Sequence, residues 1–143
     1  MGTMSINVLE RTREIGVMRA IGASNFTAAR LAESLATSER LGLPRYETLQ
    51  PLYNLVDRAA FEAELQPLCL QHDIGVINFF GLARGFLTGK YRTGTPADSR
   101  AASPHFSNFV GAYLTDRHAR VVEAVARAAD GLGWSPVEVA LSW

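Results

Sequence analysis

Three things are scarce in this chain of 143 residues: cysteine, net charge and long apolar runs. The 14 Lys and Arg residues are balanced by 14 Asp and Glu residues, so the basic excess of a surface that binds nucleic acid or anionic membrane is absent. No run of about 18 apolar residues occurs, so the sequence offers no candidate membrane span. The N-terminus lacks the basic-then-apolar layout of an export signal, and the cytoplasm is the expected location.

The single cysteine, Cys69, excludes a disulfide framework and a thiolate metal cluster. Its apolar neighbours predict that it is a small buried hydrophobic residue. The three histidines, His72, His105 and His118, do not have the spacing of metal ligands. We expect each histidine at the surface without a functional role, and no metal site is predicted.

Strands and helices alternate along the first half of the chain. The patterns predict strands at residues 17–22, 46–50 and 75–80, with helices at 27–41 and 59–72 between them. Pro67 is expected to kink or split the second helix because proline has no N–H to donate. This alternation indicates an α/β fold whose parallel strands are joined by right-handed crossovers.

The second half of the chain begins with a long region that is rich in glycine and proline. Residues 86–115 read as an irregular loop, and loops of that length are usually functional or mobile. A helix is predicted at 116–132, with an apolar side formed by Val121, Val122, Val125, Ala128 and Ala129. Another helix is expected to open at Ser135, where Pro136 and Glu138 complete a capping box.

Four stretches of the sequence resemble parts of the aldo-keto reductases, a family of nicotinamide-dependent (β/α)8-barrel oxidoreductases. They are residues 21–26 (IGASNF), 49–55 (LQPLYNL), 75–92 (GVINFFGLARGFLTGKYR) and 135–143 (SPVEVALSW). In order, they are similar to the ends of barrel strands five and six, to strand seven with its loop, and to the helix before strand eight. The resemblance covers about residues 16–143 and favours the channel-β-subunit-like branch of the family.

This resemblance implies a partial TIM barrel with about three parallel βα units, a long loop and C-terminal helices. A closed barrel typically needs about 250 residues, so the chain is expected to be a truncated one. The open sheet edges of such a piece lead to an alternative interpretation, in which it self-associates or completes a partner's sheet without catalysing a reaction.

The resemblance also implies a site for a nicotinamide cofactor, NADPH first and NADH as the alternative. Ser24, Asn25 and Gln50 would hydrogen-bond the nicotinamide carboxamide, which needs both a donor and an acceptor. Phe79 would stack on the nicotinamide ring. From the residues alone, Ser24 could instead cap the helix that begins near Thr27, and Gln50 could satisfy backbone groups.

Further residues of the same resemblance are assigned to the cofactor phosphates. The backbone of Phe80, Gly81, Leu82 and Ala83 would pass along the pyrophosphate, and Lys90 and Arg100 would place cations near the phosphates. Without the resemblance, Phe79 and Phe80 read as core residues, and both cations read as solvated loop charges.

No catalytic residue is predicted. The family uses a tyrosine acid tuned by a lysine and an aspartate, together with a histidine, all from the first half of the barrel. No Asp-x4-Tyr pair of that kind stands before Ser24, and general acid catalysis needs such a proton donor. We therefore expect an aldo-keto reductase fragment that keeps part of the cofactor site, is inactive alone, and meets small carbonyl substrates only in a complete barrel.

Residues 4–24 also resemble the cytoplasmic coupling segment of macrolide-exporter and lipoprotein-exporter ABC permeases. This second resemblance divides the chain into a permease-like leader, residues 1–15, and a truncated reductase barrel, residues 16–143. A chimera joined within residues 19–24 would explain both likenesses. A functionless charged leader is the alternative, and a permease-coupling role is the least favoured function.

Overall fold

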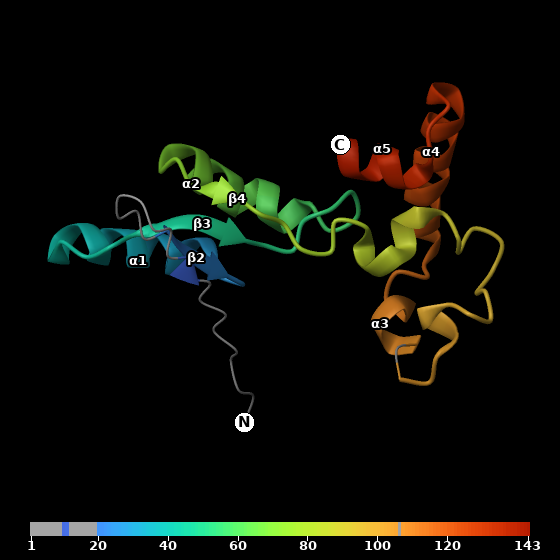
Figure 1. The fold of residues 1–143 in the computed structure, drawn as a ribbon, viewed down its shortest axis with the longest axis horizontal. Coiled ribbons are helices and arrows are strands. Elements are labelled where there is room, and N and C mark those ends of the chain that lie inside the picture. Colours follow the sequence, from blue (N-terminus) through green and yellow to red (C-terminus); the bar gives the residue numbers. More distant parts are fainter. Residues whose placement is uncertain (1–9, 12–19, 106) are drawn as a thin grey trace. The chain divides into compact units, whose positions relative to one another are not determined.

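The computed structural model describes residues 10–11, 20–105 and 107–143 (Figure 1). The chain divides into two compact units. Unit 1 comprises Met1–Leu52 and Ala59–Phe79, and unit 2 comprises Tyr53–Arg58 and Phe80–Trp143. The parallel strands belong to unit 1, whereas the C-terminal helices belong to unit 2.

Unit 1 is built on a sheet with the strand order β1-β2-β3-β4. The strands β2, β3 and β4 pair in parallel, and β1 pairs with β2 in the antiparallel direction. Ser24 lies opposite Gln50, so the carboxyl ends of β2 and β3 lie side by side at the same end of the sheet. The strands are β1 (Glu10–Arg11), β2 (Ala20–Ser24), β3 (Tyr46–Gln50) and β4 (Gly75–Val76).

This sheet confirms the predicted parallel α/β arrangement. Strand β2 includes the described part of the predicted strand at 17–22 and continues two residues beyond Gly22. Apart from residues 10–11, the predicted leader at residues 1–15 lies outside the described residues. Within the predicted leader, Glu10–Arg11 is a strand that pairs with the start of β2.

Helix α1 (Ala28–Leu41) makes the first crossover, between β2 and β3. Its N-cap is Thr27, whose side chain accepts a hydrogen bond from the backbone N–H three residues later. Ser24 is therefore not the cap of this helix. Leu31 and Leu35 lie on the buried face and anchor the helix in unit 1.

The second crossover is one continuous helical segment, residues 59–71, whose hydrogen bonding changes from π to α just before Pro67, so the helix is not split. A π-helical turn, Phe61–Leu65, precedes helix α2 (Gln66–Gln71), and the first residue of α2 donates its N–H to the carbonyl of Phe61. Pro67 is the second residue of α2 and directly follows this change of helix type. Cys69 is only 3% exposed, so its expected role as a small buried hydrophobic residue is confirmed.

The strand predicted at 75–80 is shorter in the structure, and its apolar residues are exposed. Strand β4 is Gly75–Val76 alone, although Ile77 and Phe79 continue the pairing through N–H bonds of 2.9 and 3.0 Å to carbonyls in and just after β3. Val76 is 40% exposed and Ile77 is 58% exposed. An apolar run is buried when both sheet faces are covered, but β4 is the edge strand of the described sheet. Self-association through this edge stays a prediction.

Unit 2 draws much of its core from the region that the sequence predicted to be an irregular loop. Phe86, Leu87, Tyr91, Val110 and Tyr113 are all buried and pack in one cluster with residues of the last two helices. The correction has a physical reason: large apolar side chains stand between the glycines and prolines, and their burial outweighs the weak local propensity. The elements are two 3₁₀ turns (η2, Ala83–Thr88, and η3, Arg100–Ala102), α3 (Ser107–Gly111), α4 (Asp116–Leu132) and α5 (Pro136–Ser142).

Helix α5 begins with the predicted capping box. The Ser135 hydroxyl accepts from the Glu138 N–H at 3.3 Å, and the Glu138 carboxylate accepts from the Ser135 N–H at 2.7 Å. The same carboxylate also accepts from the Ser135 hydroxyl at 2.8 Å. Its bond from the Ser135 N–H, followed by its bond from the hydroxyl, lowers the pKa of Glu138 from the usual 4.5. The ionised carboxylate therefore stabilises the start of α5.

A glutamine at position 138 tests this cap through its pH dependence. A lowered pKa gives a stabilisation that is present above pH 4.5 and is lost as the pH falls through the folded-state pKa. We expect Glu138→Gln to melt at a lower temperature than the wild type near pH 7, and at the same temperature at about pH 2. Thermal melts of both proteins at the two pH values check this. A difference that persists at low pH would contradict the role of the charge.

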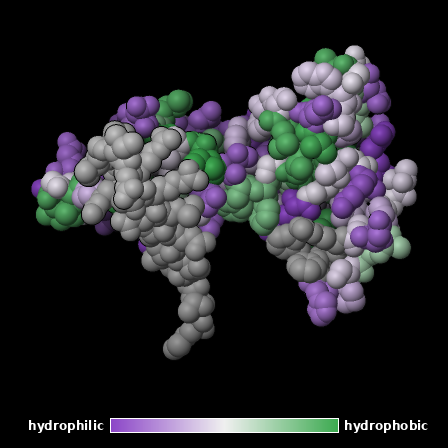
Figure 2. Space-filling model, viewed as in Figure 1, coloured by the Kyte–Doolittle hydropathy of each residue, from purple (hydrophilic) through white to green (hydrophobic). Residues whose placement is uncertain are grey.

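Hydrophobic residues also reach the surface. Figure 2 shows green hydrophobic groups gathered near α5, where Leu141 is 62% exposed. Within the described residues, no helix combines the length and apolar character needed to cross a membrane.

Candidate functional site

The carboxyl ends of β2 and β3 bring three of the predicted residues together in unit 1. The Ser24 hydroxyl lies 3.4 Å from both the backbone carbonyl and the side-chain Oε1 of Gln50. The Asn25 N–H also donates to the Gln50 carbonyl at 3.4 Å. Hydrogen bonds of this length are weak, so a ligand with a donor and an acceptor could replace them.

Asn25 marks the point where the chain leaves the strand. Its φ of 56° lies in the left-handed region, which asparagine tolerates better than most residues. The Asn25 side chain is exposed and Ser24 is half-buried. The ends of β2 and β3 therefore present a hydroxyl and two amides, those of Asn25 and Gln50, at neighbouring positions of the sheet.

Phe79 lies at the same carboxyl end of the sheet. It forms a parallel bridge with Leu52, two residues after the end of β3, and its N–H donates to the carbonyl of Pro51 at 3.0 Å. Its ring is half-buried. The aromatic residue thus follows the next strand of unit 1, in the order that the sequence predicted.

The predicted phosphate-binding turn, residues 80–83, belongs to unit 2 and has an unusual backbone. Phe80 has a φ of 54° and Ala83 a φ of 48°, both in the left-handed region that non-glycine residues rarely adopt. The Ala83 N–H donates to the Phe80 carbonyl at 2.7 Å, so it is already used within the turn. In the described part of the chain, the N–H groups of Gly81 and Leu82 make no hydrogen bond.

The two predicted cations follow in unit 2. Lys90 is exposed, and its ammonium lies 5.2 Å from the centroid of the Tyr91 ring. Gly89, with a φ of 83°, makes the turn that precedes it. Arg100 is the first residue of η3, and the description of the structure does not extend to its side chain.

A buried hydrogen-bond network beside this turn was missed by the sequence reasoning. Asn54 is 2% exposed, and its Nδ2 donates to the Phe80 carbonyl at 3.1 Å and to the Asp57 carboxylate at 3.0 Å. The Tyr113 hydroxyl donates to the same Asp57 oxygen at 2.6 Å. Burial, followed by this bond to Asp57, raises the pKa of Tyr113 to about 12. The one sequence signal was that Asn54 falls within the stretch 49–55.

His118 is less exposed than the expected surface position. Its ring is half-buried, with Nδ1 3.3 Å from the Tyr113 carbonyl, and it meets the Phe86 ring edge-on at 6.3 Å. This histidine is a packing residue of unit 2. In the described residues, no group of three or more His, Cys, Asp or Glu side chains could hold a metal ion.

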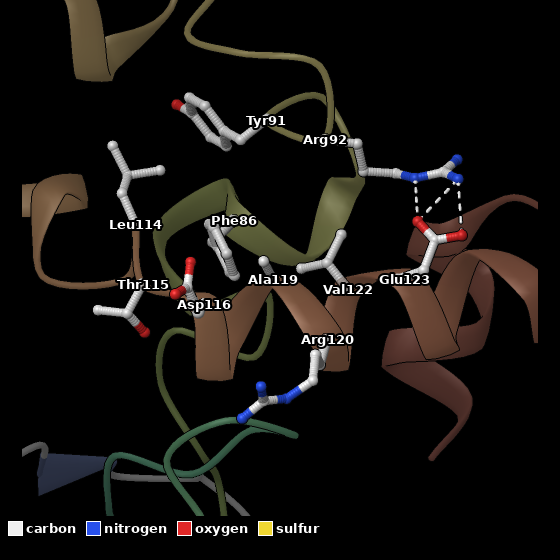
Figure 3. A pocket seen from close by; sticks show the side chains of 10 residues that line it. All are labelled: Phe86, Tyr91, Arg92, Leu114, Thr115, Asp116, Ala119, Arg120, Val122 and Glu123. Atoms are coloured by element: carbon white, nitrogen blue, oxygen red, sulfur yellow. Dashed lines mark hydrogen bonds and ion pairs between the residues drawn. The ribbon is translucent and has the colours of Figure 1, made fainter.

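Unit 2 also contains a pocket of about 450 Å³ that includes none of the predicted cofactor residues (Figure 3). Phe86 and Val122 contribute apolar surface, and Arg92 forms an ion pair of 2.9 Å with Glu123 at one side. The lining residues are Phe86, Tyr91, Arg92, Leu114, Thr115, Asp116, Ala119, Arg120, Val122 and Glu123.

Comparison with known proteins finds several relatives that match most of this chain. A probable voltage-gated potassium channel subunit beta from Arabidopsis thaliana is 36% identical over 123 residues, which cover 85% of this chain and 38% of the relative. Protein tas from Escherichia coli is 31% identical over 140 residues, covering 97% and 39%. L-glyceraldehyde 3-phosphate reductase from Escherichia coli is 33% identical over 96 residues, covering 66% and 28%.

A solved structure is also similar. The glycerol dehydrogenase of Gluconobacter oxydans matches 87% of this chain and 36% of its own chain, with a TM-score of 0.58 and 25% identity. Together with the three parallel strands of unit 1, this match identifies the fold as part of an α/β barrel. The chain thus spans less than two fifths of the length of these relatives.

The family model described as "Aldo/keto reductase family" matches residues 4–143. The match includes residues on both sides of the predicted boundary after residue 15, and the division into leader and barrel stays a prediction. The relatives favour the channel-β-subunit-like branch. Because the family model covers nearly the whole chain, the protein belongs to the aldo/keto reductase family.

Proposed function

We propose that this chain supplies the nicotinamide-cofactor-binding part of an aldo-keto reductase barrel, with NADPH as the first candidate and NADH as the alternative. The observation that carries the proposal is the pairing of Ser24 with Gln50 at the shared carboxyl end of β2 and β3. Ligands of parallel α/β sheets bind at this end of the strands.

In unit 1, the proposal assigns Ser24, Asn25 and Gln50 to the nicotinamide carboxamide. A carboxamide presents one carbonyl acceptor and one NH2 donor group. The Ser24 hydroxyl and the two side-chain amides offer a donor for that carbonyl and an acceptor for that NH2 group. The 3.4 Å bonds between Ser24 and Gln50 are weak, so replacing them with bonds to the cofactor costs little free energy. Phe79, which follows the neighbouring strand, offers an aromatic face for stacking.

In unit 2, the proposal assigns the phosphates to the turn at residues 80–83 and to the cations of Lys90 and Arg100. The available N–H groups are those of Gly81 and Leu82, since Ala83 donates within the turn. Lys90, with Arg100 as the second predicted cation, would balance the phosphate charge. Two adjacent backbone N–H groups and an ammonium are a common way to hold a phosphate oxygen.

The chemistry follows from what these residues do. A bound nicotinamide cofactor supplies the hydride, and the protein orients it and excludes competing reactions. The residues assigned here bind and orient, and none of them is proposed as a proton donor to a carbonyl oxygen. The proposed role is therefore cofactor binding without turnover by this chain alone. Reduction of a small carbonyl substrate is assigned only to a complete barrel.

A fluorescence titration with NADPH tests this function. We expect saturable binding, together with no oxidation of the cofactor when an aldehyde is added, because no tuned acid is present. NADH titrated in parallel decides between the two cofactors. An absence of binding by protein whose circular dichroism shows the helices and strands described above would refute the proposal.

A further inference from the structure

We propose that Asn54 is a positioning residue of the cofactor site, which holds the turn at residues 80–83 in its binding conformation through a network with Asp57 and Tyr113. This inference rests on the proposed function above. All the residues that carry it belong to unit 2.

The turn needs an external support because its backbone is strained. Phe80 and Ala83 both have left-handed φ values, 54° and 48°. Such conformations persist only where the surroundings determine them. Ala83 is fully buried and is fixed by packing, but Phe80 is 37% exposed and its side chain has less packing to hold it. The backbone of Phe80 is instead held at its carbonyl, which accepts from the Ala83 N–H and from Asn54 Nδ2.

The Asn54 amide uses its full hydrogen-bonding capacity. Its Oδ1 accepts from the N–H groups of Val56 and Asp57, both at 2.9 Å, and its Nδ2 donates to Asp57 and to the Phe80 carbonyl. An amide has two donor hydrogens and two acceptor lone pairs, so only one orientation of this side chain makes all four hydrogen bonds. The side-chain oxygen stabilises the turn at residues 54–57, and the side-chain nitrogen binds the turn at residues 80–83.

Asp57 and Tyr113 connect this amide to the core of unit 2. The Asp57 oxygen that accepts from Asn54 also accepts from the Tyr113 hydroxyl at 2.6 Å. Tyr113 is 5% exposed and its ring stacks on Phe86, with centroids 5.9 Å apart. Because both ends of the network are buried, the turn is held before any ligand arrives. A site formed in advance binds more tightly, since less ordering is left to occur on binding.

The variant Asn54→Asp separates the two halves of the amide. Aspartate keeps an acceptor for the N–H groups of Val56 and Asp57, but it has no donor for the Phe80 carbonyl. We expect its NADPH affinity to fall about tenfold or more, which corresponds to the loss of a buried hydrogen bond. We also expect faster hydrogen exchange at the Ala83 N–H, measured without cofactor, because that amide is closed by the Phe80 carbonyl.

Ser135→Ala is the matched control, because it weakens the cap of α5 in the same unit and touches none of these residues. Equal losses of NADPH affinity and Ala83 protection in Asn54→Asp and Ser135→Ala would overturn the inference, as would wild-type values of both in Asn54→Asp. If Asn54→Asp does not fold, Tyr113→Phe decides: it keeps the ring but removes the hydroxyl, and unchanged Ala83 protection in it would overturn the inference. If the wild type binds no NADPH, the proposed function fails, and the exchange data still decide whether Asn54 holds the turn.

Discussion

Replacing Leu87 by alanine is expected to lower the free energy of unfolding of unit 2 by roughly 2–5 kcal/mol. Leu87 has no exposed surface and packs in the cluster that includes Phe86, Val110 and Tyr113. Truncation removes buried apolar area and leaves a cavity, and both effects destabilise a close-packed core. A loss of this size is a large share of the stability of a small unit.

Urea denaturation, followed by circular dichroism, measures this effect. Leu132→Ala is the control, since Leu132 also lies in unit 2 but is 59% exposed, and its truncation should change the free energy by no more than about 0.5 kcal/mol. If Leu87→Ala behaved like this control, residues 86–115 would be the irregular loop that their glycines and prolines predict, and the core described for unit 2 would be wrong.

The second large effect concerns the two groups of cofactor residues. Removing the ammonium with Lys90→Ala is expected to weaken NADPH binding by roughly 10- to 100-fold, because bonds to charged groups are the stronger ones. The same loss is expected for 2′-phospho-ADP-ribose, which keeps the phosphates but lacks the nicotinamide. Gln50→Ala should weaken NADPH binding about tenfold and leave 2′-phospho-ADP-ribose unaffected.

Calorimetric titrations of the two ligands check this pattern. Arg92→Ala is the matched control for charge, because Arg92 stands two residues after Lys90 and is paired with Glu123. If Lys90→Ala and Arg92→Ala lost the same affinity, a general electrostatic attraction would explain binding and Lys90 would have no specific role. Equal losses of both ligands in Gln50→Ala would contradict its assignment to the carboxamide.

Periodic features of the fold could be predicted from the sequence. Helix α4 has the predicted bounds, and its buried residues include Val122, Val125 and Ala129. The prediction was wrong at one position of this face: it named Ala128, which is exposed, and omitted Ala126, which is buried. The cap of α5 was also visible, because a capping box needs only residues that are three apart in sequence.

Burial that depends on distant neighbours could not be predicted in this way. The run at residues 75–80 is apolar enough for a covered strand, yet Ile77 is exposed because β4 lies at the edge of the described sheet. Conversely, Phe86, Tyr91 and Val110 follow no helical or strand period, and only their packing in unit 2 shows them to be core residues.

The candidate site shows the same division. Ser24 and Gln50 could be predicted as neighbours, because both stand at the ends of parallel strands. The network of Asn54 could not, since its bond to Phe80 spans 26 residues and the bond between Tyr113 and Asp57 spans 56. A single asparagine in a loop has no pattern that distinguishes a buried support from an ordinary turn residue.

The most direct test of a cofactor-binding part is a thermal melt of the chain at increasing concentrations of NADPH. A ligand that binds only the folded state raises the melting temperature in proportion to the logarithm of its excess over Kd. We predict a cooperative transition whose midpoint rises with NADPH and rises less in Lys90→Ala. A cooperative transition that stays at one temperature up to millimolar NADPH would contradict the proposal that this chain binds the cofactor.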